Sequence, residues 1–505
     1  MKYLVTAEEM KRYDQNTIET IGIPGLVLME RAALCTYQHL KNLLNNKEDP
    51  RILIVCGVGN NGGDGLAVAR LLLDDAYPVD VWIVGDTNRA SEQWTVQRSI
   101  LEAYQDSNLL QFCDEVTEHE YTVVVDALFG VGLSRNLERE YAEAIEICNG
   151  IKALKVAIDV PSGIHSDHGK VMGVAFFADI TVTFGFGKRG LFVYPGCDYA
   201  GKVYIEKIGI NEKAFLGNIP QMFYYDEPVR ELMPYRDEKG NKGTFGKVLL
   251  IAGSKNMAGA AILAAKAAFC AGCGMVKILS DADNRIILQQ AVPDAMFGEY
   301  NELLAAMEWC DVIAAGPGMS QSNEAKVCLK KVIELCNKPL VLDADVLNLI
   351  AKSPEGIHLL KQQTEKKRQI VLTPHPGELS RLMKTEVSSL KEEPIGKVAE
   401  FATETGCIIV EKDAKTLVFE PNGRICLNIV NNSGLAVAGS GDVLCGLITG
   451  ILAQKEDAFE AACCGVALHS ALGKRERSDK SAYGMTASDL VSRGLYGIFH
   501  DNEKT

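Results

Sequence analysis

The strongest constraint on this chain is a repeated alternation of short apolar runs with helical patterns, which occurs in two blocks. In residues 51–210 the β-branched runs are ILIVCGVGN, VDVWIVG, YTVVVDALFG, LKVAIDVPSG and ITVTFGF. From about residue 239 they are KVLLIAGS, GMVKILS, DVIAAGPGM, PLVLDADVL, QIVLTPHPGE and CIIVEKDAKTLVF. Strands that alternate with helices form a parallel sheet with helices on both faces. The sequence therefore predicts an α/β fold of two three-layer αβα domains.

The two blocks are separated by a segment of different character. Residues 216–238 are rich in proline, aromatic and charged residues and show no sustained periodicity. A chain of 505 residues is long enough for at least two independent cores. We therefore predict an N-terminal domain over residues 1–215, a linker over 216–238 and a C-terminal domain over 239–505.

Composition narrows the classes of partner and compartment. The net charge of -14 argues against non-specific binding to nucleic acid, although backbone amides and helix ends still bind small anions. The start, MKYLVTAEEMKRYD, lacks the apolar stretch of a signal peptide, and no apolar run approaches the roughly 18 residues of a membrane span. The 15 cysteines are scattered through apolar segments, which is typical of a reducing compartment. We expect a cytoplasmic homo-oligomer without a nucleic-acid or membrane partner.

A loop of small polar residues follows the first strand of the N-terminal block. Glycine, asparagine and aspartate fill eight of nine positions there: Gly57, Gly59, Asn60, Asn61, Gly62, Gly63, Asp64 and Gly65. A capped turn needs only one or two such residues, so this composition favours close approach of the backbone to a ligand. The spacing is not G-x-G-x-x-G, which excludes the usual dinucleotide fingerprint.

Two carboxylates end later strands of the same block. Asp126 ends VVVD and Asp159 ends AID. An acid at the end of an apolar strand is costly unless it is paired or used, and either one alone could cap a helix or pair with a basic residue. Together with the loop they could surround a ligand or a hard cation, for which Asn61, Asp126 and Ser162 offer oxygen atoms.

Residues 1–215 resemble the YjeF N-terminal domain, the NAD(P)H-hydrate epimerase family, through LMERAA, GVGNNGGDGLAVAR, VVVDALFGVGL and AIDVPSGIHSDHG. The resemblance implies a Rossmann-like domain that interconverts the R and S epimers of NADH or NADPH hydrated at C6. It implies that Asn61, Asp126 and Ser162 bind K⁺ and that Asp159 is the acid or base. It further implies substrate contacts from Asn60, Asn61, Gly62, Gly63, Asp64, Gly130, Val131, Gly132, Leu133, Ser134, Arg135 and Asn136.

In the C-terminal block, AVAGSGDVLCG at residues 436–446 combines a turn of small residues with an acid and then an apolar run. Such a turn before a helix leaves free backbone N–H groups and a positive dipole end, which suit an anion. A carboxylate there, Asp442, suits the role of base for the group that attacks a phosphate. The stretch indicates phosphoryl transfer, although similar turns also serve packing alone.

Residues 239–495 look like the ADP/ATP-dependent NAD(P)H-hydrate dehydratases of the ribokinase-like superfamily. The resemblance is carried by GTFGKVLLIAGSKNMAGAAILAAKAAFCAGCGMVKI, AAGPGM, LVLDADVLNLI, LTPHPGELSRL and NNSGLAVAGSGDVLCGLITGIL. It implies that Asp442 deprotonates the accepting hydroxyl and that Ala258, Gly318 and His375 also contact the substrate. It implies nucleotide contacts from Lys412, Asp413, Ala414, Lys415, Thr416, Asn432, Ser433, Gly434, Leu435, Ala436, Val437, Ala438, Gly439, Ser440 and Gly441. The charge of the transferred phosphate implies Mg²⁺.

Several positions keep a structural alternative. His375, flanked by Pro374 and Pro376, could be a turn residue, and Asp343 and Asp345 could support the site or cap a helix. The sequence also departs from the family in two places. NNSGLAVA replaces a Gly-Asn-Pro-Gly type turn, and Asp413 replaces the glycine of a Lys-Gly pair, where an inward-facing acid would repel phosphate.

The sequence therefore favours a bifunctional metabolite repair enzyme. Its front half would epimerise hydrated NAD(P)H and its rear half would dehydrate the S-form at the expense of ADP or ATP. One alternative is a hydroxymethylpyrimidine or hydroxyethylthiazole type kinase fused to a non-catalytic ligand-binding module, which leaves the first half without a role. Another treats the N-terminal domain as a scaffold, and the presence of Asp126 and Asp159 counts against it.

Overall fold

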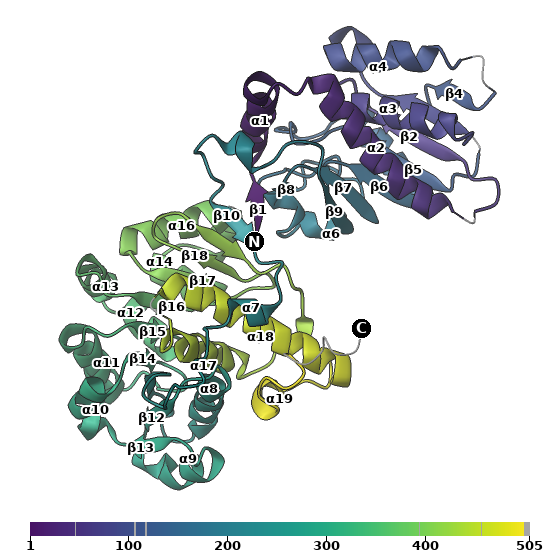
Figure 1. Ribbon diagram of the computed structural model, residues 1–505. Helices are drawn as coiled ribbons and strands as arrows, with labels where there is room; N and C mark the ends of the chain where they lie inside the picture. Colours follow the sequence, from purple (N-terminus) through teal and green to yellow (C-terminus); the bar gives the residue numbers. More distant parts are fainter. Residues whose placement is uncertain (46, 106–107, 117–118, 393, 456, 499–505) are drawn as a thin grey trace. The chain divides into compact units, whose positions relative to one another are not determined.

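The computed structural model describes residues 1–45, 47–105, 108–116, 119–392, 394–455 and 457–498. The chain forms two compact units, one over Lys2–Met222 and one from Phe223 onward, with Met1 grouped with the second. The division falls inside the segment 216–238. Each unit carries its own sheet (Figure 1), and each is described separately.

The sheet of the N-terminal unit has the order β4-β3-β2-β5-β6-β7-β9, and every neighbouring pair is parallel. All residues of the central strands β2 and β5 are buried, as their β-branched composition predicts. The strands are β2 Ile52–Cys56, β3 Val79–Ile83, β4 Leu110–Cys113, β5 Val123–Ala127, β6 Leu154–Ile158, β7 Ile180–Phe184 and β9 Lys202–Glu206. A short parallel pair joins β1 (Lys2–Val5) to β8 (Gly187–Lys188).

Helices cover both faces of this sheet. The helices are α1 Ala7–Asn16, α2 Gly25–Leu44, α3 Asn60–Asp74, α4 Glu92–Glu102, α5 Glu140–Gly150 and α6 Gly196–Tyr199. Ile54 of β2 packs into a core shared with α2, α3 and α4, whereas the next residue, Val55, packs into a core shared with α5. Because successive residues of a strand point to opposite faces, these two cores confirm the three-layer arrangement.

The sheet of the C-terminal unit includes the order β13-β12-β11-β14-β15-β16-β17-β18-β19. Its strands are β11 Lys247–Ile251, β12 Met275–Leu279, β13 Met296–Gly298, β14 Val312–Ala315, β15 Leu340–Leu342, β16 Ile370–Leu372, β17 Ile408–Glu411, β18 Leu417–Phe419 and β19 Ile425–Leu427. Neighbouring strands from β13 to β17 pair in parallel. The pairs β17–β18 and β18–β19 are antiparallel. Short connections of about five residues permit only antiparallel neighbours, which explains this departure from the predicted parallel sheet.

Two groups of helices flank the C-terminal sheet (Figure 1). The helices of this unit are α7 Val229–Leu232, α8 Ala258–Cys270, α9 Arg285–Ala291, α10 Leu303–Trp309, α11 Asn323–Leu335, α12 Asp345–Lys352, α13 Gly356–Glu365, α14 Pro376–Met383, α15 Val387–Glu392, α16 Pro394–Thr405, α17 Ser440–Leu452, α18 Ala458–Lys480 and α19 Ala487–Ser492. α8, α17 and α18 pack on one another and on the strands, while α11, α12, α13, α14 and α16 form the second group. The segment 216–238 contains β10 (Met222–Tyr224) and the single turn α7.

The apolar helix α17 is the element that carries Asp442 into position. It is buried from Val443 to Leu452 between α8 and α18. A Cβ added to Gly446 would lie 2.2 Å from the carbonyl oxygen of Ala264 in α8. Only glycine allows this approach, so the apolar run after Asp442 is a buried core helix.

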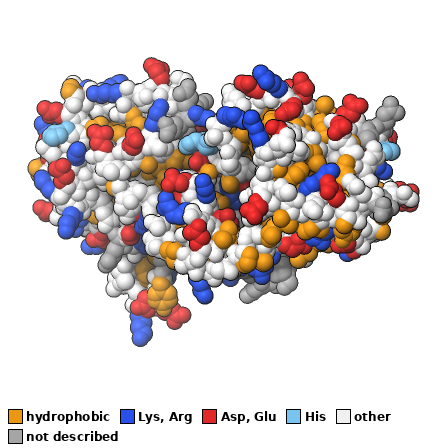
Figure 2. All heavy atoms as spheres, turned by 90° about the horizontal axis from the view of Figure 1, so that it is seen from above, with side chains coloured by type: hydrophobic (Ala, Val, Ile, Leu, Met, Phe, Trp, Pro, Cys, Tyr) orange, Lys and Arg blue, Asp and Glu red, His pale blue; other side chains and the backbone are white. Residues whose placement is uncertain are grey.

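Among the described residues, none of the helices is both long and apolar enough to span a bilayer. On the face shown in Figure 2, acidic and basic side chains are interspersed, with apolar side chains between them.

Candidate active sites

The first candidate site lies where the order of the N-terminal sheet reverses. β2 and β5 are neighbours, and the chain continues from β2 toward β3 on one side and from β5 toward β6 on the other. Ligands of open parallel sheets bind at the carboxyl ends of strands at such a point. Asn61, Asp126 and Asp159 all follow or end strands at this edge.

Asp126 fixes the loop that contains Ser162. Its Oδ2 accepts a hydrogen bond from the Ser162 amide at 2.7 Å, and its Oδ1 accepts from Ser162 Oγ at 2.6 Å and from the Leu128 amide at 3.1 Å. Ser162 Oγ in turn accepts from the Phe129 amide at 2.9 Å. Burial raises the pKa of Asp126 to about 6, although the hydrogen bonds from Ser162 and Leu128 oppose the rise. The structure therefore brings Asp126 and Ser162 together.

Asp159 is held by three partners. Its Oδ1 lies 2.6 Å from Lys188 Nζ and accepts from Thr183 Oγ1 at 3.1 Å, while its Oδ2 accepts from the Val131 amide at 3.2 Å. Its backbone is left-handed, with φ of +67°, which costs a non-glycine residue about 1–3 kcal/mol. Strain of this kind persists where the surrounding contacts fix the residue, as they do here.

Lys188 lies in this candidate site beside Asp159, and the sequence reasoning missed it. It is 1 % exposed, and besides Asp159 it donates to Thr183 Oγ1 at 2.9 Å and to the Phe184 carbonyl at 2.8 Å. A buried cation is costly unless it is paired. A lysine directly after the apolar strand ITVTFGF was the available signal.

Asp64 adds a second carboxyl group to this centre. Burial raises its pKa well above the ordinary value, and the charges of Asp159 and Asp14 raise it further, while Lys188 opposes them. The raised pKa of Asp64 favours its protonated form, which can donate a hydrogen bond. Two carboxyl groups in different environments, one of them paired with a lysine, are typical of acid–base sites.

The two segments expected to bind substrate meet at Gly130. A Cβ added there would lie 2.8 Å from Asp159 Oδ2 and 3.2 Å from Asn61 Oδ1. Asn61 Nδ2 is buried and has no hydrogen-bond partner among the described residues. An orphaned buried amide is costly, so this group favours a ligand that completes its hydrogen bonds.

The glycines of the first loop have a different explanation from the one predicted. The helix α3 begins at Asn60, so Gly62, Gly63 and Gly65 lie inside it. A Cβ on Gly62 would lie 1.8 Å from the Gly57 carbonyl oxygen, and one on Gly65 would lie 2.6 Å from Ala127 Cβ. Close approach of backbone to protein, rather than to a ligand, requires glycine at these positions. Gly59 has nothing within 4 Å of such a Cβ and is free to face a ligand.

The loop 130–136 offers mainly backbone and polar side chains. Gly132, Ser134, Arg135 and Asn136 are exposed. Leu133 is 6 % exposed and packs in the core shared with α5, so its side chain is a core side chain.

The second candidate site lies at the first turn of α17. Asp442 follows Gly439, whose φ of +90° turns the chain into the helix. Burial raises the pKa of Asp442 to about 6, Asp343 and Asp345 add to the rise, and Lys412 opposes it. A carboxylate with this pKa is ionised at neutral pH and is a better proton acceptor than an exposed one.

A buried ion pair lies beside Asp442. Lys412 Nζ is 2.6 Å from Asp343 Oδ1, and Asp343 is 1 % exposed and also accepts from Thr373 Oγ1 at 2.8 Å. A Cβ on Gly441 would lie 3.3 Å from Lys412 Nζ, so the segment before Asp442 passes directly over the pair. Burial lowers the pKa of Lys412, but the charge and hydrogen bond of Asp343 outweigh burial and raise it overall. Asp343 thus supports the site through Lys412.

His375 is the N-cap of α14, which supports the alternative of a turn residue. Its Nδ1 accepts from the Gly377 amide at 3.1 Å, and its own amide donates to Glu378 Oε2 at 3.0 Å. The ring is half exposed, so a substrate can still contact it. Asp345 begins α12 and accepts from the Ser320 amide at 2.8 Å, which is a structural role at a loop after β14.

Gly318 packs against Met257, the residue that precedes Ala258. A Cβ on Gly318 would lie 3.1 Å from Met257 Cβ and 2.9 Å from Ala260 Cβ, and the φ of Gly318 is +56°. Ala258 begins α8. Both are therefore backbone contact points at the carboxyl edge of β11 and β14.

The residues expected to bind nucleotide form two separate segments. In 412–416, Asp413 is exposed and accepts from the Ala414 amide at 2.7 Å, and Lys415 Nζ donates to the Ile429 carbonyl at 2.7 Å. In 432–441, Asn432 caps the short turn Ser433–Leu435, and its Nδ2 is buried without a partner among the described residues. Ala436 and Ala438 are exposed, while Val437 is half-buried. Ser440 Oγ lies 3.1 Å from His469 Nε2.

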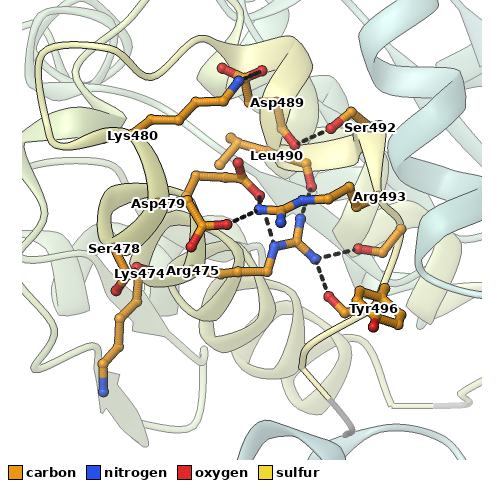
Figure 3. A network of polar contacts seen from close by, with 12 residues as sticks. Lys474, Arg475, Ser478, Asp479, Lys480, Asp489, Leu490, Ser492, Arg493 and Tyr496 are labelled. Carbon is orange, nitrogen blue, oxygen red and sulfur yellow. Dashed lines mark hydrogen bonds and ion pairs between the residues drawn. The ribbon is translucent and has the colours of Figure 1, made fainter. Parts of the chain in front are cut away.

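The C-terminal part of α18 packs against the second of these segments, 432–441. A Cβ on Gly473 would lie 2.8 Å from Asn432 Nδ2. Polar contacts around Arg475 and Arg493 fix this end (Figure 3). The buried Glu476 accepts from Arg475 Nε at 2.8 Å and from Arg493 Nη2 at 2.6 Å. Arg475 also donates to the carbonyls of Gly494 and Tyr496. The network joins α18 to the segment after α19.

Comparison with known proteins accounts for both sites. Residues 25–190 match the family described as YjeF-related protein N-terminus, and residues 248–494 match the NAD(P)H-hydrate dehydratase family. A bifunctional NAD(P)H-hydrate repair enzyme of Moorella thermoacetica is 34% identical over 97% of this chain and 95% of its own length. The chain belongs to the bifunctional NAD(P)H-hydrate repair enzymes.

Further relatives carry the same description. The repair enzyme of Coxiella burnetii is 32% identical over 97% of this chain and 98% of its own, and that of Escherichia coli is 30% identical over 96% and 92%. Among solved structures, an ADP/ATP-dependent NAD(P)H-hydrate dehydratase of Bacillus subtilis co-crystallised with ATP/Mg²⁺ is 31% identical, with a TM-score of 0.48, and covers 55% of this chain and 98% of its own.

The full-length matches favour a repair enzyme over the vitamin-precursor kinase. They span both halves, whereas the kinase alternative explained only the second. In this repair enzyme Lys188 is the addition to the residues that the sequence indicated, which already included Asp64 and Asp343.

Proposed function

We propose that the N-terminal unit interconverts the R and S epimers of hydrated NADH and NADPH, and that the C-terminal unit dehydrates the S-form at the expense of ADP or ATP. One observation carries the proposal. Each unit of a chain that matches repair enzymes over nearly its whole length holds its own partly buried carboxylate, Asp159 after strand β6 in one unit and Asp442 in the first turn of α17 in the other.

In the N-terminal unit, Asp159 is proposed to move the proton that inversion requires. The C6 hydroxyl of a carbinolamine must be protonated and released, or deprotonated for ring opening, before the centre inverts. Lys188 and Thr183 hold one oxygen of Asp159, and the other faces Gly130 and Asn61. That second oxygen is available to the substrate hydroxyl, and neutral Asp64 supplies a donor beside it.

The same unit offers a set of oxygen atoms that fits K⁺. Asp126, Ser162 and Asn61 contact three successive residues of one loop: Leu128, Phe129 and Gly130. Carboxylate, hydroxyl and amide oxygens are the ligands that hard cations take. A bound K⁺ would offset the negative charge of the carboxylates there and help to orient a substrate with phosphate groups. We therefore propose Asn61, Asp126 and Ser162 as its ligands.

In the C-terminal unit, Asp442 is proposed to accept the proton of the C6 hydroxyl as that oxygen takes the transferred phosphoryl group. Hydroxide is a poor leaving group and phosphate a good one. The ring nitrogen lone pair can then expel phosphate, and loss of a neighbouring proton restores the dihydropyridine. The chain contributes positioning and charge: the first turn of α17 and Lys412 face the developing negative charge.

The nucleotide is proposed to lie along 412–416 and 432–441. The unpartnered amide of Asn432 is a hydrogen-bond donor that favours an anion on this side. Mg²⁺ would arrive on the nucleotide phosphates and neutralise their charge, since it is usually held by one or two carboxylates plus substrate phosphates.

The direct test is recovery of the reduced-nicotinamide absorbance. A mixture of hydrate epimers is added to the protein with ATP or ADP, and complete nucleotide-dependent recovery is expected. Recovery of only the S-epimer's share of the absorbance would contradict the proposed epimerase activity. Phosphorylation of thiazole or pyrimidine alcohols, with the hydrates unchanged, would contradict the whole proposal.

A further inference from the structure

Three metal-ligating side chains stand close together on the loop between β6 and β7. His165, Asp167 and His168 each place a ligand atom within 4.8 Å of the other two, and within the described ranges this is the one such group of three. The two imidazole rings stack, with centroids 4.9 Å apart and planes inclined by 29°. None of the three has a role in the function proposed above.

Several backbone hydrogen bonds hold this loop in place. The His165 amide donates to the Lys170 carbonyl at 2.9 Å, and the Gly169 amide donates back to His165 at 2.8 Å. The Gly190 amide donates to the Ser166 carbonyl at 2.6 Å. Because these hydrogen bonds order the loop before an ion binds, binding costs little further conformational entropy.

The carboxylate of the three is held through one oxygen. Asp167 Oδ1 accepts from the Ala7 amide at 2.6 Å and from Ser166 Oγ at 3.3 Å, and the described residues give its Oδ2 no hydrogen bond. One carboxylate oxygen is therefore fixed by the fold, and the other can bind an ion.

One contact opposes metal binding and limits its strength. His165 Nδ1 accepts from the Asp167 amide at 3.2 Å. Coordination through Nδ1 takes that lone pair, and coordination through Nε2 moves the proton to Nδ1, so either mode gives up this hydrogen bond. It is a single long bond, whereas coordination adds three ligands, and the balance favours the ion.

We propose that His165, Asp167 and His168 bind a divalent transition-metal ion of the Zn²⁺, Co²⁺ or Ni²⁺ class. Two imidazoles and one carboxylate suit these ions, whereas K⁺, Mg²⁺ and Ca²⁺ prefer oxygen ligands alone. The site is separate from Asp159 but connected with it, because Ser166 Oγ donates to the Val131 carbonyl at 3.3 Å and the Val131 amide donates to Asp159.

The test measures binding rather than catalysis, so it does not depend on the proposed function. Untagged full-length protein is treated with a chelator, and Zn²⁺ binding is measured by equilibrium dialysis. We expect one ion per chain in the wild type, with affinity reduced in His168→Ala by at least the ~10–100-fold that loss of an outer contact costs. Asp167→Asn keeps a carbonyl oxygen for the Ala7 amide, so it preserves the loop and still weakens binding. His358→Ala, on exposed α13, is the matched control.

Co²⁺ identifies the ligand type in the same samples. We expect visible d–d bands without an intense thiolate-to-cobalt band in the near ultraviolet. Absence of binding to the wild type, equal affinity in His168→Ala and Asp167→Asn, or a thiolate band that places the ion on cysteine would each overturn the proposal.

Discussion

At the residue scale, the pairing of Lys188 with Asp159 organises the N-terminal site. A nearly fully buried cation is stable only because Asp159, Thr183 and the Phe184 carbonyl accept hydrogen bonds from its three N–H groups. The pair lies next to Asp64, whose own pKa is raised by burial and by the charge of Asp159. The sequence indicated the carboxylate but not its cationic partner, because the strand order that places β8 beside them cannot be read from a local pattern.

Replacing this lysine tests the arrangement. Lys188→Met keeps the length of the side chain and removes the charge, so Asp159 should lose its ion-pair partner and its oxygen should lose its orientation. We expect epimer exchange to fall by about 10²-fold or more, within the range that general acid–base groups contribute, while nucleotide-dependent dehydration continues. Both rates are measured by chromatography of the hydrates. Lys213→Met, at an exposed position of the same unit, is the control, and an unchanged exchange rate in Lys188→Met would refute the role.

The pKa of Asp442 predicts a pH dependence. Dehydration needs ionised Asp442, and its pKa is raised to about 6, so kcat/KM should fall as the pH drops through about 6. Asp343→Asn removes a charge that raises the pKa of Asp442 and frees Lys412, which lowers that pKa, so the fall in kcat/KM should move to lower pH. Glu404→Gln, at an exposed position of α16, should leave the pH of this fall unchanged. If kcat/KM falls at the same pH in Asp343→Asn as in the wild type, Asp442 is not the titrating group.

At the element scale, the position of Asp442 depends on how closely α17 packs against α8. Gly446 and Gly450 touch carbonyl oxygens of α8, at Ala264 and Ala268, so the two helices share a contact surface without side chains between them. Any side chain added there must move the helices apart, and the first turn of α17 moves with them.

Gly446→Val tests this coupling. The added Cβ would meet the Ala264 carbonyl oxygen at 2.2 Å, so we expect a loss of about 1–3 kcal/mol or more of unfolding free energy in the C-terminal unit and weaker dehydration, with epimer exchange retained. Chemical denaturation and the two activity assays measure these effects. Gly259→Ala in α8 has open space around its Cβ and should not destabilise. Equal stability of Gly446→Val and wild type would contradict the packing argument.

The elements themselves were largely predictable from the sequence. Every apolar run named in the sequence contains a strand, because β-branched runs buried on both faces have few other solutions. The antiparallel β18 and β19 were not separated from β17, since their runs are only three residues long. The glycines of α3 were assigned to a ligand because sequence composition cannot tell a close protein contact from a close ligand contact.

At the scale of the whole molecule, the sequence indicated two α/β units and one family, and the full-length relatives confirm the family. Asp126, Ser162, Asp159 and Asp442 could be proposed from the sequence because they are acids or small polar residues that follow apolar strands or precede a buried helix. Asp64 and Asp343 were named there too, but their proximity to Asp159 and Lys412, like the position of Lys188, depends on contacts between distant segments that only the fold reveals. The limits of the domains and the roles of all these residues stay predictions.

The central claim is that one chain holds two separate chemical centres. Its most direct test is chromatography of both hydrate epimers with two variants of the full-length protein. Asp442→Asn should lower nucleotide-dependent dehydration by about 10²–10⁴-fold while the epimers continue to exchange, and Asp159→Asn should stop exchange while the S-form is still dehydrated. Equal loss of both activities in either variant, with the fold intact by circular dichroism, would contradict the account.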